Sequence, residues 1–351
     1  MSPRDDHGQR SVLPPRSDGA GGRRGAGRIG ARLLATYVPT VLLVVTIVFA
    51  LPRAMPGDPL GALQDPASGV FVDDAQTRAN LRAYYGLDRP LTDQYVNYLE
   101  SLTRGDLGWS IARQEPVTSL IGQHLPWTLL LVGVSLTLAA GLSFVAGVAA
   151  AWRRGRRSDR TLVTALTALN AVPEYAMAVT LLILFGVVMP VLPLYGARTT
   201  FGEYGSWLAE AGDVAAHLVL PATALTLSLI GAKFLLVRNT MVSTLGQDYM
   251  VLARAKGLPE RMLKYRHAGR NALLPFLTVV GIQTGFAVSG AVFVESVFAY
   301  PGMGSLILGA VETRDYPVLE ASFLVLAAVV LTVNLLLESV YARVDPRVGR
   351  P

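Results

Sequence analysis

Long apolar runs separated by polar segments dominate the chain from about residue 30 onward. Six runs reach about 20 residues, enough for a helix to cross the ~30 Å hydrocarbon core of a membrane at about 1.5 Å per residue. They cover residues 33–52, 126–151, 161–189, 218–237, 274–298 and 319–341. The pattern therefore predicts an all-α integral membrane protein with six transmembrane helices.

Two polar regions flank the first apolar run. Residues 1–28 are rich in Gly, Arg, Pro and Ser, so we expect a disordered basic tail there and one membrane domain over residues 29–351. In the loop 53–125, the spacing of apolar residues predicts short amphipathic helices over Asp73–Tyr85 and Leu91–Leu102. This loop fits either a lid on the membrane surface or a docking surface for an extracytoplasmic partner.

Positive charge is distributed unevenly among the polar segments. Most of the 31 lysines and arginines lie in residues 1–32, 152–160 and 238–273 and after residue 341. Because cytoplasmic loops carry such an excess, we expect both termini and the loop 238–273 in the cytoplasm of a bacterial cell, with the chain in its inner (plasma) membrane. The net charge of +6 fits anchoring to anionic lipid better than nucleic-acid binding, since it is spread over separate short loops.

Sequence signatures of catalysis or metal binding are missing from the chain. It contains no cysteine, no GxxxxGK[ST] phosphate loop, and no HExxH or GxSxG motif. We interpret the histidines as polar residues near span ends or in the tail; they are His7, His124, His217 and His267. We therefore expect no catalytic, cofactor or metal site in this chain.

Ionisable residues inside the predicted spans are candidates for a transport pathway, because charge is costly in hydrocarbon. Glu174, directly after Pro173, and Glu295 are the residues most suited to face an aqueous cavity, although neither has an evident charged partner. Lys233 and Glu320 lie nearer to span ends, and Glu338 does too, so their side chains are expected to reach the membrane surface.

Small residues also mark one face of the fifth run. Gly281, Gly285 and Ser289 recur every four residues, a spacing that lets helix backbones approach closely. We interpret this face as a packing seam, which could lie against a second membrane subunit, rather than as a solute contact.

The loop 238–273 is long enough to fold as a helical hairpin. The residue pattern predicts a helix over Asp248–Lys256, with Gly257 as its left-handed C-terminal cap. Pro259 suits the first turn of a second helix, Glu260–Ala272, and Pro275 is expected to open the next membrane span.

The first helix of this hairpin carries the candidate contact residues. Ala253 and Ala255 keep it slim, so it could enter a groove on another protein. An amphipathic hairpin lying on the lipid surface is the alternative. The candidate contact residues are Asp248, Ala253, Ala255, Lys256, Gly257 and Pro259.

Several motifs give the chain a resemblance to a known family. In order they are PGDP at Pro56–Pro59, YGLDRPL at Tyr85–Leu91, GDLGWS at Gly105–Ser110, QDYMVLARAKGLPERMLKYRHAGRNALLP at Gln247–Pro275, VFVESVFAYPGMG at Val292–Gly304, RDYP at Arg314–Pro317 and DPR at Asp345–Arg347. Together they make the chain after residue 30 resemble the B-type permease subunit of ABC importers in the dipeptide/oligopeptide/nickel group.

The resemblance implies a type I ABC importer transmembrane domain working by alternating access. The hairpin would be the family's EAA coupling loop, whose helix inserts into a cytoplasmic ATPase. The triplet falls on Val251, Leu252 and Ala253 and departs from the general pattern at the first two positions; the glycine falls on Gly257. Implied partners are a second homologous permease, two ABC ATPases that bind ATP and Mg, and an extracytoplasmic solute-binding protein.

The cargo implied by the resemblance is a di- or oligopeptide. Nickel chelates, glutathione and oligosaccharides remain alternatives, because the binding protein largely sets specificity in this family. Two other classes also stay open from the residues: an ion-coupled secondary carrier acting alone, and a membrane scaffold that does not transport.

Overall fold

The computed structural model describes residues 21–54, 60, 75–84 and 86–344. The chain divides into two compact units, Met1–Ile47 and Val48–Pro351, and the first helix, α1 (Gly21–Ala54), begins in one and ends in the other. Of the tail predicted to be disordered, residues 1–20 lie outside the described residues. Residues 21–28 form the first turns of α1 instead, since an established helix gains one hydrogen bond per added residue.

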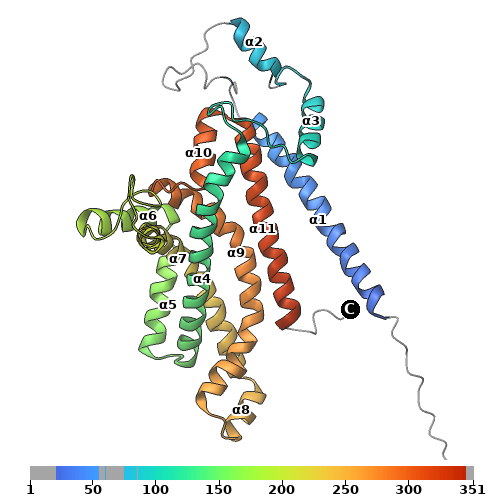
Figure 1. The fold of residues 1–351 in the computed structure, drawn as a ribbon. Coiled ribbons are helices and arrows are strands. Elements are labelled where there is room, and N and C mark those ends of the chain that lie inside the picture. Colours follow the sequence, from blue (N-terminus) through green and yellow to red (C-terminus); the bar gives the residue numbers. More distant parts are fainter. Residues whose placement is uncertain (1–20, 55–59, 61–74, 85, 345–351) are drawn as a thin grey trace, which may run out of the picture. The chain divides into compact units, whose positions relative to one another are not determined.

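The second unit is built from helices. They are α2 (Ala75–Tyr84), α3 (Leu91–Thr103), α4 (Val117–Trp152), α5 (Arg157–Asn170), α6 (Glu174–Leu182), the π-helical η3 (Ile183–Val188), α7 (Trp207–Leu245), α8 (Asp248–Ala255), the π-helical η4 (Met262–Gly269), α9 (Arg270–Val297), α10 (Met303–Thr313) and α11 (Tyr316–Val344). Figure 1 shows α8 at one end of the bundle and α10 at the other. The two amphipathic helices predicted in the loop 53–125 are confirmed as α2 and α3.

Four helical stretches in the described part of the chain are long and apolar enough to cross a membrane, or five if the bent pair α5–η3 counts as one span. They overlap the second, fourth, fifth and sixth predicted runs. The described apolar part of α1, Val38–Ala54, is a shorter helix. The multi-pass membrane class is thus confirmed, while the number of six spans stays a prediction.

The third predicted span, 161–189, is not one continuous helix, and whether its two parts form one broken span stays a prediction. α5 ends at Asn170, α6 begins at Glu174, and the two parts meet at an angle of 100°. Pro173 has an extended backbone (φ −59°, ψ 147°) and is the N-cap of α6. Its ring also disfavours the α-helical conformation at the residue before it. The proline therefore breaks the helix here.

The fifth span also begins differently from the prediction. η4 runs directly into α9, so that Met262–Val297 is one continuous helical stretch, and Pro275 lies inside it. Proline removes one backbone hydrogen bond, a loss that membrane helices tolerate because neighbouring groups satisfy the freed carbonyl. Pro275 therefore does not open the span, and the hairpin and the span share one helix.

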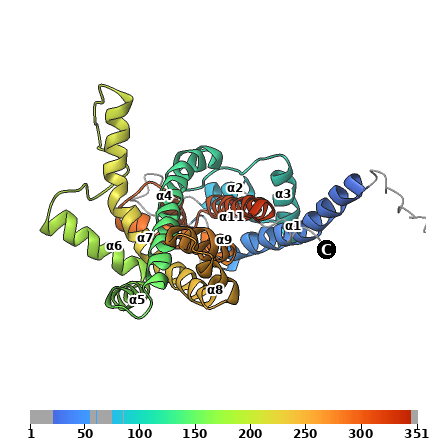
Figure 2. The same ribbon diagram turned by 90° about the horizontal axis from the view of Figure 1, so that it is seen from below.

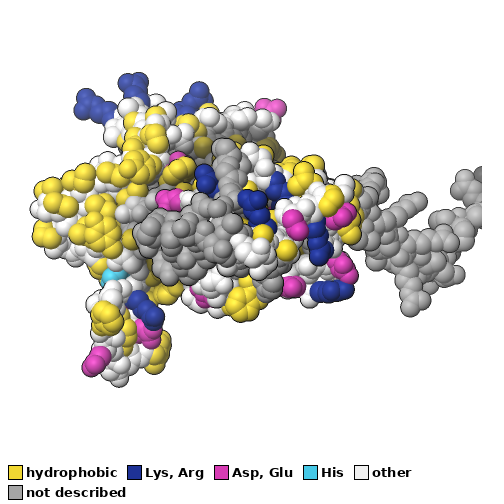
Figure 3. All heavy atoms as spheres, turned by 90° about the horizontal axis from the view of Figure 1, so that it is seen from above, with side chains coloured by type: hydrophobic (Ala, Val, Ile, Leu, Met, Phe, Trp, Pro, Cys, Tyr) yellow, Lys and Arg dark blue, Asp and Glu magenta, His cyan; other side chains and the backbone are white. Residues whose placement is uncertain are grey.

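Two apolar clusters hold the second unit together. The larger lies where α4, α7 and α9 pack against one another, with α6, α10 and α11 around them. In the end-on view of Figure 2 these helices gather together, while the N-terminal part of α7 extends away from them. Seen from above in Figure 3, apolar side chains gather on the side where α6 and η3 lie; exposed ones there include Ile183, Val187 and Val188.

Candidate functional site

The end of α8 has the cap geometry that its sequence predicts. Gly257 has a φ of +70°, in the left-handed region. Its N–H donates to the carbonyl of Arg254 at 2.9 Å, and the N–H of Leu258 donates to that of Ala253 at 3.4 Å. This pair of bonds is the Schellman motif, which glycine favours because it has no Cβ. Pro259 follows, and its carbonyl accepts the first bonds of the second helix, from Met262 and Leu263.

One face of α8 is fixed to the membrane domain. Met250 and Ala253 are buried in the second apolar cluster, with residues from the ends of α4, α7 and α9, such as Val148, Met241 and Phe276. The side-chain amide of Asn271 also donates to the hydroxyl of Tyr249 at 2.6 Å. The main neighbour of α8 among the described helices is η4, which in turn contacts α4, α7 and α9.

The other face of α8 is apolar and open. Val251 is 61% exposed and Leu252 56%, and Ala255 is exposed as well. Asp248 begins the helix and Lys256 ends it, and both side chains are exposed. The candidate residues therefore divide: Ala253 is part of the internal contact, while Asp248, Ala255 and Lys256 are available to a partner.

A buried ion pair fixes the neighbouring turn between α4 and α5. Both carboxylate oxygens of Asp159 accept from Arg238 of α7, at 2.7 Å from Nε and 2.8 Å from Nη2. Asp159 also accepts from the backbone N–H of Gly155, at 2.9 Å. This pair has no local signal in the sequence, because its members lie 79 residues apart.

Removing the carboxylate of Asp159 should destabilise the membrane domain. We expect Asp159→Ala to lower the free energy of unfolding by about 3 kcal/mol, since it leaves the half-buried Arg238 without its partner. The thermal unfolding midpoint of the purified full chain in detergent measures this. Glu203→Ala, which removes an exposed carboxylate, is the control, and equal midpoints for both variants would contradict the structural role.

Glu295 does not face a cavity, which corrects the pathway interpretation of this residue. Its side chain is fully buried. It accepts hydrogen bonds from the hydroxyl of Thr128 at 2.6 Å and from the backbone N–H of Gly304 at 2.7 Å. A Cβ on Gly302 would lie 2.2 Å from its Oε1. The motif VFVESVFAYPGMG thus folds its glutamate into its own glycine turn.

The other intramembrane candidates are packed as well. Glu174 opens α6 after the break and is half-buried beside α9, where a Cβ on Gly290 would lie 3.3 Å from its Cγ. Lys233 and Glu320 are both buried within the protein and have partners there. Lys233 is buried and donates to the carbonyl of Leu229 at 3.1 Å, and Glu320 pairs with Arg53.

The small-residue face of α9 packs against another helix of the same chain at two of its three positions. A Cβ on Gly281 would lie 3.1 Å from Leu337 of α11, and one on Gly285 would lie 4.0 Å from Val330. Ser289 is exposed and stands outside this seam. The packing interpretation is confirmed for the two glycines, with α11 as the neighbour.

Two of the family-like motifs meet in space. The hydroxyl of Ser110, which ends GDLGWS, donates to the carboxylate of Asp315 in RDYP, and the backbone N–H of Ala112 donates to the same oxygen at 3.1 Å. Asp315 is buried directly before α11, so this contact ties the loop before α4 to the last helix. The motifs PGDP and DPR lie outside the described residues.

Comparisons with known proteins agree with these motifs. Residues 143–350 match the family model described as binding-protein-dependent transport system inner membrane component. The chain is 39% identical to a putative peptide permease protein of Brucella ovis, over 88% of this chain and 95% of that protein. It is 33% identical to the glutathione transport system permease protein GsiC of Escherichia coli, over 90% of this chain and 97% of that protein.

A third relative comes from another organism. The di/tripeptide transport system permease protein DppB of Pseudomonas aeruginosa is 34% identical, over 91% of this chain and 97% of the relative. The family match covers more than half of the chain, and the relatives are covered almost end to end. The chain therefore belongs to the inner-membrane permease components of binding-protein-dependent ABC importers, in the peptide and nickel group, with the type I transmembrane fold.

Proposed function

We propose that this chain is the permease subunit of an ATP-driven importer that moves di- or oligopeptides into the cell by alternating access. The peptide, glutathione and di/tripeptide names of its relatives favour a peptide cargo, and glutathione is itself a tripeptide. Nickel chelates and oligosaccharides are the less favoured cargoes.

The observation that carries the proposal is the two-faced α8. Its inner face is buried among the ends of α4, α7 and α9, and its outer face presents Val251 and Leu252 to water. Exposed apolar patches of this kind mark protein contacts. We infer that this face docks into a cytoplasmic ABC ATPase, where ATP and Mg are bound, and that the buried face passes ATPase closure to the spans.

The remaining partners follow from the same arrangement. The excess of lysine and arginine supports a cytoplasmic location for both termini and the loop 238–273. The loop 53–125, with α2 and α3, would then face the extracytoplasmic solute-binding protein. A second, homologous permease completes the pathway, and ATP hydrolysis belongs to the ATPase subunits rather than to this chain.

Reconstitution tests the proposal. Proteoliposomes holding this chain, the second permease and two ATPases should accumulate a labelled tripeptide only when ATP and the binding protein are both supplied. Uptake by this chain alone under an ion gradient would instead identify a secondary carrier. Absence of accumulation with every partner and cargo class present would identify a scaffold.

A further inference from the structure

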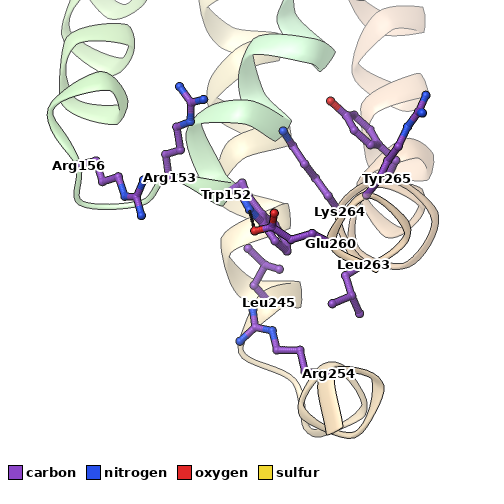
Figure 4. Close-up of a pocket in the computed structure, with 10 residues that line it drawn as sticks. Trp152, Arg153, Arg156, Leu245, Arg254, Glu260, Leu263, Lys264 and Tyr265 are labelled. Carbon is purple, nitrogen blue, oxygen red and sulfur yellow. Dashed lines mark hydrogen bonds between the residues drawn. The ribbon is translucent and has the colours of Figure 1, made fainter. Parts of the chain in front are cut away.

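A cleft of about 820 Å³ opens where α4 ends, between the α4–α5 turn, the end of α7, α8 and η4 (Figure 4). Five cationic side chains from these elements line it: Arg153, Arg156, Arg254, Arg261 and Lys264. Neither the family match nor the proposed docking of α8 accounts for this cluster.

The positive charge of the cleft is not neutralised within the described part of the chain. None of the five cations forms an ion pair with a described carboxylate. The one acid on the cleft wall, Glu260, accepts a hydrogen bond from the indole Nε1 of Trp152 at 2.9 Å (Figure 4). Like charges gathered in a concave site raise its positive potential, so an anion in the cleft would be stabilised.

The position of the cleft selects the kind of anion. Trp152 is the last residue of α4 and stands between the apolar run 126–151 and the basic residues that begin at Arg153, a change in composition typical of a membrane surface. Tyr265 lies on the cleft wall too, with the ammonium of Lys264 at 5.1 Å from its ring centroid. Tryptophan and tyrosine concentrate at membrane interfaces, beside the lipid phosphates.

The cleft is also separate from the face of α8 proposed to meet the ATPase. Val251 and Leu252 do not line it, whereas Arg254 does. The exposed apolar residues of α8 and the cations of the cleft therefore form two different surfaces.

We propose that this cleft binds the phosphate headgroup of an anionic phospholipid. Guanidinium groups pair with phosphate oxygens through two parallel hydrogen bonds, and basic pockets between membrane helices suit such headgroups. A bound headgroup would link the α4–α5 turn to α8 and η4, and so support the loop that the ATPase moves. The assignment of the headgroup to the cytoplasmic leaflet rests on the proposed function, whereas the binding of the headgroup does not.

Lipid binding to the full-length chain tests the proposal. The probe is dioleoylphosphatidylglycerol, added to delipidated protein and measured by native mass spectrometry, with dioleoylphosphatidylcholine as the neutral reference. We expect selective binding of the anionic lipid. The triple variant Arg153→Gln, Arg156→Gln, Lys264→Gln should weaken it at least about tenfold, since each cation near a lipid surface contributes about fivefold.

A matched variant removes the same charge outside the cleft. Arg157→Gln, Arg160→Gln, Arg266→Gln alters three exposed cations that do not line it and should keep the affinity. Equal losses in both triples, or no preference for the anionic lipid, would overturn the proposal. Displacement of the lipid by millimolar inorganic phosphate would assign the cleft to a soluble anion instead.

A second readout separates lipid from protein as the ligand. If the cleft triple keeps its lipid affinity but no longer co-purifies with the ATPases, the cations contact a protein acid and the lipid assignment is overturned. Lipid binding is measured without partners, so failure of the transport proposal would leave this result unaffected.

Discussion

Gly257→Pro should abolish ATP-driven uptake while the protein still inserts into the membrane. Proline holds φ near −65°, whereas Gly257 has a φ of +70°. Proline also lacks the N–H that bonds the carbonyl of Arg254. The cap of α8 is therefore lost, and the helix no longer holds its place against the second apolar cluster. Uptake into reconstituted proteoliposomes and the amount of protein in the membrane measure the two effects.

Asparagine at the same position provides the matched control. No atom lies within 4 Å of a Cβ on Gly257, so only the backbone angle restricts the residue there. Asparagine adopts the left-handed region more readily than other non-glycine residues. We expect Gly257→Asn to keep most of the uptake, and normal uptake by Gly257→Pro would contradict the coupling role of α8.

Glu295→Ala should cause the largest loss of stability. The substitution leaves the Thr128 hydroxyl and the Gly304 N–H without their buried acceptor and opens a cavity. Each unsatisfied buried group costs about 1–3 kcal/mol, so we expect a loss of about 4 kcal/mol once the cavity is included. The thermal unfolding midpoint in detergent and the yield of monodisperse protein measure it.

Two further variants separate the structural role of Glu295 from a pathway role. Glu312→Ala removes an exposed carboxylate from α10 and should leave the midpoint unchanged. Glu295→Gln keeps the shape and one acceptor, so it should lose less than half as much stability as the alanine variant and keep ATP-driven uptake. Loss of uptake with unchanged stability in Glu295→Gln would instead support a carboxylate that carries protons.

The features predicted correctly from the sequence depend on local residue patterns. The apolar runs of α4, α7, α9 and α11 follow from their length. The hairpin follows from the glycine at position 257, whose left-handed angle ends α8, and from the proline two residues later. Such signals involve residues within a few positions of one another, so no knowledge of the tertiary contacts is needed.

The features that were missed depend on contacts between distant segments. Asp159 pairs with Arg238, which lies 79 positions away, and Ser110 donates a hydrogen bond to Asp315, which lies 205 positions away. Only the packing of the helices brings these residues together. The short helix α10 was missed too, because its 11 residues are too few for the length argument that identifies spans.

Some sequence signals fit more than one structure. Pro173 was recognised, yet the run around it was long enough to predict one span, whereas the proline breaks the chain into α5 and α6. Small residues at four-residue spacing predict a seam but not its partner, and Gly281 packs on α11 of the same chain. Glu295 was interpreted as facing a cavity because no partner is evident near it in the sequence. Its hydrogen-bond donor Thr128 lies 167 residues away.

A single engineered cysteine tests the central claim most directly, because the chain has no cysteine of its own. Leu252→Cys places a thiol on the exposed face of α8, and Phe201→Cys places one on a 97% exposed residue before α7. In the assembled importer, we predict that Leu252→Cys crosslinks to the ATPase and is not labelled by a membrane-impermeant maleimide applied to intact cells. Phe201→Cys should be labelled by the maleimide and should not crosslink to the ATPase. Labelling of Leu252→Cys from outside, with no crosslink to an ATP-hydrolysing subunit, would contradict the importer account.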